Sequence, residues 1–358
     1  MANVVAMFVQ YLSAKTGLAT GQDLPTLCRR HLPRPVAGFL WVQAELVVMA
    51  TDLAEFVGAA IALNLLFGVP LFPAGLATAV ISFAILALQR LGYRPFELAT
   101  TFLLGVIGFG FLYQIFAVGG PSVSGVGSGL APRLAGTESL TLAVGIIGAT
   151  VMPHVIYLHS AVTAQRKRPV DDFAKRAALR GLRIDCFAGL GLAGLINLTM
   201  ICIAAVLFHG VGGGFDGSLQ GAHESLGRLV GGAAALAFAV ALLASGLSSS
   251  GVGTFAGQVV MQGFIRRRIP LFLRRGLTMA PALVILGTGL SPDNALVVSQ
   301  VVLSFGIPFA LFPLVLFTRR RDLMGDLANR PLTTWTGVAV CLVLSGLNLY
   351  LLSQLLFG

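Results

Sequence analysis

The chain has 358 residues, of which 56% are hydrophobic and only 11% are charged, whereas about a quarter of the residues in soluble domains are charged. This composition excludes an ordinary soluble domain and predicts an all-α integral membrane protein. The net charge of +10 does not indicate nucleic-acid binding, because the basic residues lie in short loops without an RNA- or DNA-binding module. We expect contact with anionic membrane lipid instead.

Apolar runs recur along the whole chain, and each is close to the ~20 residues that a helix needs to cross a bilayer. We expect a partial helix over 1–14, followed by nine full spans. The seventh span is expected to begin nearer Leu271 than residue 277. The nine spans are predicted over 36–66, 70–89, 96–118, 138–164, 184–208, 228–264, 277–290, 293–317 and 334–357.

Lysine and arginine are concentrated in alternate loops, which fixes the expected orientation. Short loops rich in these residues stay on the cytoplasmic side, and all basic residues except Arg133 and Arg228 lie in five of them. The five loops are 15–35, 90–95, 165–183, 266–275 and 319–330. The Gly-rich segments 119–129 and 210–217 are then expected to be flexible connectors on the outer side.

The sequence Gly-Ala-Thr-Val-Met-Pro-His at 148–154 interrupts the predicted span 138–164. Pro153 has no N–H, so carbonyls near Ala149 lose their helical donors, which a bilayer tolerates only where protein or water satisfies them. The Met152 thioether and the His154 imidazole suit late transition metals better than magnesium or calcium. The segment predicts a cation site at membrane depth, although a simple kink filled by an apolar Met is the alternative.

Three acidic residues, Glu45, Asp52 and Glu55, fall within the predicted span 36–66. Steps of seven and three residues place them on one face of a helix, which we call the acidic stripe. Carboxylates inside a membrane usually mark an ion or proton pathway. A structural ion pair that fixes helix packing is the alternative for any one of them.

Four further polar residues in or beside predicted spans leave two interpretations open. His159 either extends a proton path or caps a wet helix face. Arg274 and Arg275 either set the topology or pair with the acidic stripe. Gln300 either offers a carbonyl oxygen to an ion or makes a hydrogen bond between helices.

The chain resembles the NRAMP family of proton-coupled divalent metal transporters, in particular its bacterial manganese-importing branch. The resemblance covers essentially all 358 residues in order. It rests on the segment 148–154 and on Tyr-Leu-His-Ser at 157–160, Thr-Asp-Leu-Ala-Glu-Phe-Val-Gly at 51–58, Leu-Ser-Ala-Lys at 12–15, Ser-Gln at 299–300 and Arg-Arg-Arg-Asp-Leu-Met at 319–324.

The resemblance implies a leucine-transporter-like fold of two inverted repeats, in one transmembrane domain over 1–358. Residues 1–118 would be the remainder of the first repeat, 138–317 the second repeat and 334–357 an extra helix. The implied function is import of Mn²⁺ or Fe²⁺, with Co²⁺ and Cd²⁺ as further candidates, across the bacterial inner membrane together with protons. The metal is then the transported substrate, no cofactor is expected, and the protein is not an enzyme.

By resemblance, the Met152 sulfur and the Ala149 carbonyl are metal ligands, and Gln300 adds an oxygen in some states. Pro153 marks the helix break. The implied proton route comprises Asp52, Glu55, Glu45, His154, Arg274 and Arg275, and His159 lies where it would extend this route.

One departure from the family pattern affects the expected metal site. The family's first helix carries an Asp-Pro-Gly-Asn break that supplies hard ligands, and this motif does not occur in the chain. We therefore expect that the family's first helix is missing and that the remaining neutral donors bind a divalent ion weakly. The alternative function is a transport-incompetent membrane protein. A membrane metalloenzyme is a distant third, because the chain has no paired-His protease motif.

Overall fold

The computed structural model describes residues 1–88, 93–119, 127, 129, 136–165, 172–208 and 217–357. Within these ranges the regular structure is helical and no strand occurs, which confirms the predicted all-α class. The expected connectors 119–129 and 210–217 lie almost wholly outside the described residues, as do parts of the basic loops 90–95 and 165–183.

The helices follow the predicted spans closely. They are α1 (Ala2–Thr20), α2 (Leu24–His31), α3 (Arg34–Phe67), α4 (Leu71–Leu88), α5 (Tyr93–Val118), α7 (Thr137–Val151), α8 (Pro153–Ala164), α9 (Asp172–Phe208), α10 (Leu219–Leu229), α11 (Gly232–Ile265), α12 (Leu271–Thr288), α13 (Pro292–Thr318), α14 (Arg321–Met324) and α15 (Pro331–Phe357). In the described part of the chain, eight spans are long and apolar enough to cross a membrane, with α7 and α8 forming one of them. The ninth expected span is α4, whose apolar stretch is shorter. The protein is a multi-pass membrane protein.

Several helices differ from the sequence-based expectation. Helix α1 continues to Thr20 instead of ending at residue 14, and α9 begins at Asp172 rather than at 184. The short helices α2 and α10 were not predicted at all. Each begins at a capping side chain, because Asp23 accepts from the N–H of Thr26 at 2.7 Å and Ser218 accepts from that of Gly221 at 2.8 Å. Hydropathy detects apolar length and therefore misses such polar helical turns.

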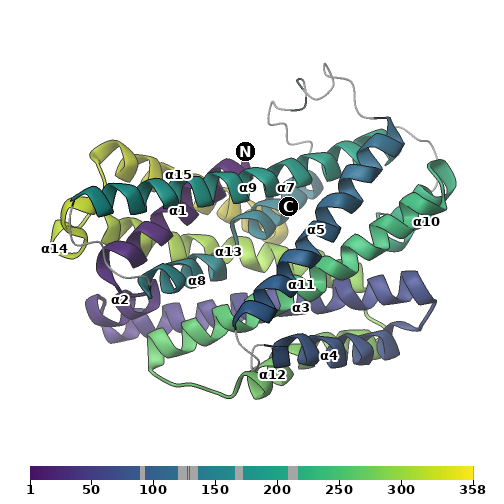
Figure 1. Cartoon of the computed structure of the whole chain (residues 1–358), viewed down its shortest axis with the longest axis horizontal. Coiled ribbons are helices and arrows are strands. Elements are labelled where there is room, and N and C mark those ends of the chain that lie inside the picture. The colour runs from purple at the N-terminus through teal and green to yellow at the C-terminus, as the bar shows by residue number, and fades with distance from the viewer. Residues whose placement is uncertain are drawn as a thin grey trace.

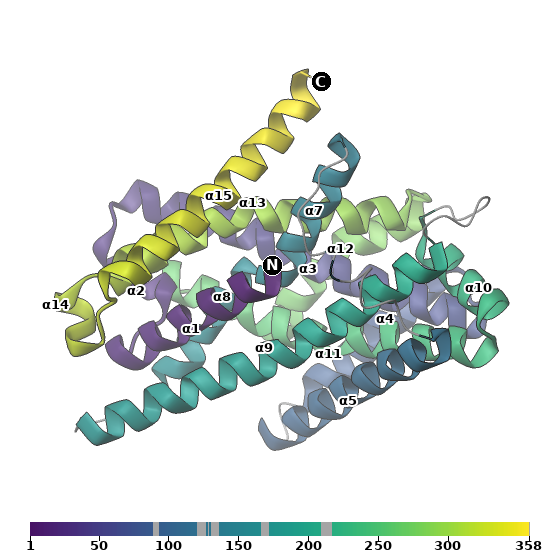
Figure 2. The ribbon, with the colours of Figure 1, turned by 90° about the horizontal axis from the view of Figure 1, so that it is seen from above.

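Helices α3 and α13 are the most buried spans of the bundle, whereas the long helices α5, α9 and α15 lie along its edges (Figures 1 and 2). Helix α11 lies against α3 and α5, α1 lies against α8 and α9, and α13 lies against both α7 and α3. Figure 2 shows α15 running along α13 before its C-terminal end projects from the bundle. The broken pair α7 and α8 is thus enclosed by α1 and α13.

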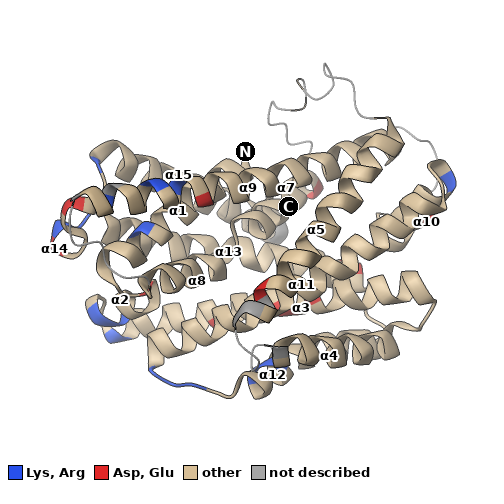
Figure 3. Ribbon diagram, in the orientation of Figure 1, with Lys and Arg blue, Asp and Glu red and all other residues tan. Residues whose placement is uncertain are grey.

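Lysine and arginine gather at the end of the molecule where α2 and α14 lie (Figure 3). We call this the basic end, and it includes the segment 266–268 between α11 and α12. Helix α10 lies at the opposite end and carries Arg228. This distribution is the one expected if the basic end faces the cytoplasm.

Helices α3 and α11 approach most closely where α11 presents a glycine. A Cβ atom added at Gly246 would lie 2.7 Å from the carbonyl oxygen of Glu55 and 2.8 Å from Cβ of Ala59. Both distances are too short for an ordinary contact, so a side chain at this position would push the two helices apart. The small residue is needed here because small side chains let membrane helices pack with their backbones close together.

We expect Gly246→Ala to destabilise the protein by about 1–3 kcal/mol, the usual cost of overfilling a packed interior. Gly38→Ala on α3 is the matched control, because an added Cβ there meets no atom within 4 Å. Its stability should stay unchanged or rise slightly, since alanine favours helix. Detergent-titrated unfolding measures both variants, and equal stability of the two would contradict the close packing at Gly246.

Candidate functional site

The predicted helix break is present and centres on Met152. Helix α7 ends at Val151 and α8 begins at Pro153, while Met152 adopts a left-handed conformation with φ 49° and ψ 88°. The Met152 N–H donates to the Gly148 carbonyl at 3.2 Å, and its own carbonyl accepts from Val155 at 3.0 Å. Because Pro153 has no N–H, the Ala149 carbonyl cannot receive the usual helical hydrogen bond.

Helix α13 crosses the break at Gln300. A Cβ atom added at Gly148 would overlap the Gln300 carbonyl oxygen and would lie 2.7 Å from the N–H of Ser304. One turn earlier, a Cβ at Gly145 would lie 3.7 Å from Cβ of Gln300. The Gln300 amide donates to the Ser299 hydroxyl at 3.3 Å. The structure therefore brings Gln300 beside the backbone that precedes Met152, whereas a role for either residue as a metal ligand stays a prediction.

Gln10 on α1 joins the two halves of the broken helix, and sequence reasoning missed it. Its Nε2 donates to the Val151 carbonyl at 3.5 Å, and its Oε1 lies 3.1 Å from Nδ1 of His159. One side chain thus contacts the end of α7 and a later turn of α8. Gln10 is 4% exposed, so no solvent competes strongly for these hydrogen bonds. The one sequence signal that could have identified Gln10 as a site residue is that it is a polar residue in an apolar segment.

His154 faces α3 and contacts Thr51 there. The Thr51 hydroxyl donates to the Val47 carbonyl at 3.0 Å and lies 3.1 Å from Nδ1 of His154. Thr51 thereby links the first turn of α8 to the middle of α3.

Both arginines of α12 pair with the acidic stripe on α3. Arg275 lies 2.8 Å from Asp52, and each side chain is 1% exposed. Arg274 lies 2.5 Å from Glu45, whose side chain is 19% exposed. The sequence left open whether these arginines set the topology or pair with the acidic stripe. The distances are those of ion pairs with the stripe.

Two carboxylate oxygens of the stripe have no hydrogen-bond partner among the described residues. They are Oδ2 of Asp52 and Oε2 of Glu55, and both are buried. A Cβ atom added at Gly253 of α11 would lie 2.7 Å from Oδ1 of Asp52 and 3.3 Å from Oε2 of Glu55. The absence of a side chain at Gly253 therefore lets both carboxyl groups lie close against the backbone of α11. An unpaired buried oxygen is costly, so these two carboxyl groups stand out within the stripe, while a role in a proton route stays a prediction.

Clusters of classical metal ligands are absent from the described part of the chain. No group of three or more His, Cys, Asp and Glu side chains there is placed to hold a metal ion. The donors expected at the break are a thioether, a backbone carbonyl and an amide oxygen, which are all neutral. Such a set favours softer transition metals but offsets little of the cost of removing their hydration shell.

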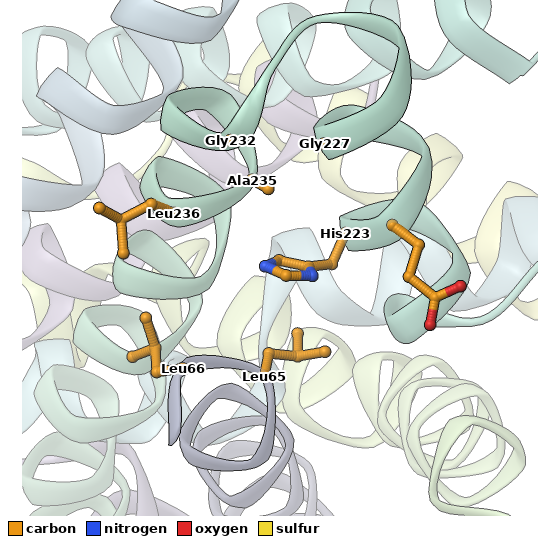
Figure 4. A pocket seen from close by; sticks show the side chains of 8 residues that line it. Leu65, Leu66, His223, Gly227, Gly232, Ala235 and Leu236 are labelled. Carbon is orange, nitrogen blue, oxygen red and sulfur yellow. The ribbon is translucent and has the colours of Figure 1, made fainter. Parts of the chain in front are cut away.

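A separate cavity of about 370 Å³ lies near α10, at the end opposite the basic end. The imidazole of His223 points toward Leu65, Leu66 and Leu236 in this cavity (Figure 4). Most of its lining is apolar, so it offers no donor set for a cation. The cavity is not part of the site at the helix break.

Removing one partner of the buried pair tests its contribution to folding. We expect Arg275→Leu to lower the unfolding free energy by about 3–5 kcal/mol, because Asp52 is left as an uncompensated buried charge. The double variant Asp52→Leu with Arg275→Leu should recover much of this loss. Arg320→Gln, which breaks an exposed pair with Asp322, is the control and should leave detergent-titrated unfolding unchanged. No recovery in the double variant would contradict the pairing.

The whole chain matches one protein family. Residues 1–354 match Nramp, described as natural resistance-associated macrophage protein-like. The divalent metal cation transporter MntH of Deinococcus radiodurans is 52% identical over 357 residues, which is 100% of this chain and 82% of that protein. MntH of Bacillus subtilis is 46% identical over 350 residues, covering 98% of this chain and 82% of the relative.

Solved structures show the same similarity in three dimensions. A manganese transporter of Eremococcus coleocola, crystallised with an aromatic bis-isothiourea compound, superposes with a TM-score of 0.87 at 35% identity, covering 99% of this chain and 78% of that one. A nucleobase-cation-symport-1 family transporter shares only the fold. It superposes with a TM-score of 0.63 at 17% identity, over 99% of this chain and 79% of that one. The predicted leucine-transporter-like class is confirmed, and the chain belongs to the Nramp family.

Proposed function

We propose that this protein is a secondary transporter that imports Mn²⁺ and Fe²⁺, with Co²⁺ and Cd²⁺ as further candidates, across the bacterial inner membrane. The observation that carries the proposal is the helix break at Met152 and Pro153 in a chain whose relatives are named divalent metal cation transporters. Carriers of this architecture bind substrate where broken helices expose backbone carbonyls near the bilayer midplane. Transport then follows alternating access around that site.

The donors at the break favour transition metals over alkaline-earth ions. Met152 supplies a soft sulfur, and the Ala149 carbonyl has lost its helical donor to Pro153. Gln300 lies on the helix that crosses the break, where its amide oxygen could complete the set in one state of the cycle. Magnesium and calcium prefer all-oxygen ligands, so a thioether at the site selects against them.

The arrangement of α3 beside the break supports coupling to protons. His154 reaches α3 through Thr51, and the next residue along α3 is Asp52. The carboxyl groups of Asp52 and Glu55 border the same glycine on α11 and hold buried unpaired oxygens. We infer that a proton displaced near the metal is accepted by this acidic stripe, with Arg274 and Arg275 tuning its charge.

The alternative of a transport-incompetent membrane protein is not favoured. Its motivation is the missing Asp-Pro-Gly-Asn motif. Against it, the chain covers 82% of curated relatives that carry a transporter name, at up to 52% identity. An enzymatic function is excluded at the level of the family, whose relatives are transporters.

Uptake into proteoliposomes tests the function and the sulfur ligand together. We expect residues 1–358 to take up Mn²⁺ and Cd²⁺, and Met152→Ala to lower their uptake relative to Ca²⁺ by about ten-fold, equivalent to about 1.4 kcal/mol of ligand free energy. Met200→Ala is the control, because Met200 is 41% exposed on α9. Unchanged uptake of all three ions by Met152→Ala would contradict the ligand assignment, and no uptake by the unaltered chain would favour the incompetent alternative.

Glu55→Gln separates proton coupling from metal binding. Glu55 has no ion-pair partner among the salt bridges of the described residues, so this change removes a titratable group without leaving an unpaired arginine. We expect Mn²⁺ uptake to lose its acceleration by an inward proton gradient, while Mn²⁺ binding measured by calorimetry is retained. Glu97→Gln on the exposed surface of α5 is the matched control. A gradient response preserved in Glu55→Gln would remove this residue from the route.

A further inference from the structure

A second cavity, of about 460 Å³, lies at the basic end between α2 and the C-terminal end of α11. It has no role in the proposed transport site. Arginine dominates its lining, which consists of Asp23, Thr26, Arg29, Gln262, Arg266 and Arg268.

The walls of this cavity are built by close packing of α2 on α11. A Cβ atom added at Gly263 would overlap Pro25 and would lie 2.8 Å from Oδ1 of Asp23. Arg29 donates through Nη1 to the carbonyl of Gly263 and, at 3.3 Å, to that of Gln262. Arg29 thereby supplies a donor to carbonyls in the last turn of α11, where the Gln262 carbonyl also accepts from the Arg266 N–H at 3.1 Å. The two helices form one rigid corner.

The chain turns sharply at this corner and directs further arginines to the cavity. Arg266 has a left-handed backbone conformation with φ 58°, and it is one of only two such non-glycine residues among those the structure describes. Arg266 is the C-cap of α11, and its N–H donates to the Gln262 carbonyl at 3.1 Å, as in other left-handed helix caps. Arg266 and Arg268 then line the same cavity as Arg29. Both are exposed.

The positive charge in the cavity is incompletely compensated. Asp23 is the acidic lining residue, and its carboxylate already accepts from the Thr26 N–H at 2.7 Å. None of the salt bridges between described residues includes the three lining arginines. Burial, followed by the proximity of Arg266 and Arg30, lowers the pKa of the Arg29 guanidinium, and Asp23 opposes this effect. An anion placed between these arginines would relieve their repulsion.

We propose that this cavity is a binding site for a phosphate group, supplied by the headgroup of an anionic phospholipid. Arginine presents a fork of donors that matches phosphate oxygens. Basic pockets between membrane helices on the cytoplasmic side hold such headgroups. A lipid is the favoured source because the cavity lies where the apolar span of α11 ends. A soluble phosphate shares the same chemistry, so the test must distinguish the two sources.

The test uses the full chain in detergent and in nanodiscs, with Arg266→Gln/Arg268→Gln as the site variant. Arg29 is left intact because it holds the end of α11. The matched control is Arg319→Gln/Arg321→Gln, which removes two exposed arginines at the same end but outside the cavity. Native mass spectrometry counts bound phosphatidylglycerol against phosphatidylcholine, and titration with inorganic phosphate tests displacement of the anionic lipid.

We expect the unaltered chain to bind phosphatidylglycerol selectively. The site variant should bind it more than ten-fold more weakly, at about five-fold for each arginine removed, while the control variant binds as before. Displacement only by millimolar phosphate supports the lipid as the ligand, and tight phosphate binding with the same dependence on Arg266 and Arg268 supports a soluble phosphate in the same site. Equal losses in the site and control variants would show a diffuse surface charge and overturn the proposal, as would no selectivity for the anionic lipid.

Discussion

A helix inside a bilayer can be interrupted only where other groups take over its backbone hydrogen bonds, and the fold is arranged around one such interruption. At Met152 the left-handed residue and the following proline separate α7 from α8. Gln10 on α1 satisfies the Val151 carbonyl, while Gly148 lets α13 approach until a side chain would overlap it. Helices from distant parts of the chain are therefore required at the same point. The Ala149 carbonyl, which loses its helical donor to Pro153, is the one that the proposed function assigns to a cation.

The second constraint is charge at membrane depth. Successive residues on a helix point about 100° apart, so Arg274 and Arg275 cannot reach the same partner. They reach Glu45 and Asp52, which lie seven residues or about 10 Å apart along α3. The two pairs together fix both the rotation and the height of α12 relative to α3. The pairs differ in burial, because the Asp52 pair is almost fully enclosed whereas Glu45 retains contact with the surface. The enclosed pair is thus the one whose disruption the fold tolerates least.

The features that could be predicted from the sequence are those that depend on short stretches of chain. Apolar length located the membrane helices, and Pro153 located the break, because both effects act within a few residues. Helices α2 and α10 were missed since their stability comes from caps and from packing on α11 rather than from apolar length. The partners of Gln10 could not be inferred, because its hydrogen bond to Val151 joins residues separated by 141 positions. The sequence allowed two interpretations of Arg274 and Arg275, and only the three-dimensional contacts show that they pair with the acidic stripe. The metal-ligand and proton roles remain predictions, since they concern ions that bind to the folded chain.

The proposed function gives a physical reason for the titratable groups that lie beside the break. A divalent cation near Met152 repels a proton on His154, which lies two residues further along and is held against α3 by Thr51. The positive charge of the cation stabilises ionised carboxylates nearby and destabilises the protonated imidazole of His154. In the proposed route, a proton leaving this region would be taken up by Asp52 and Glu55, whose buried unpaired oxygens lie beside Gly253 of α11.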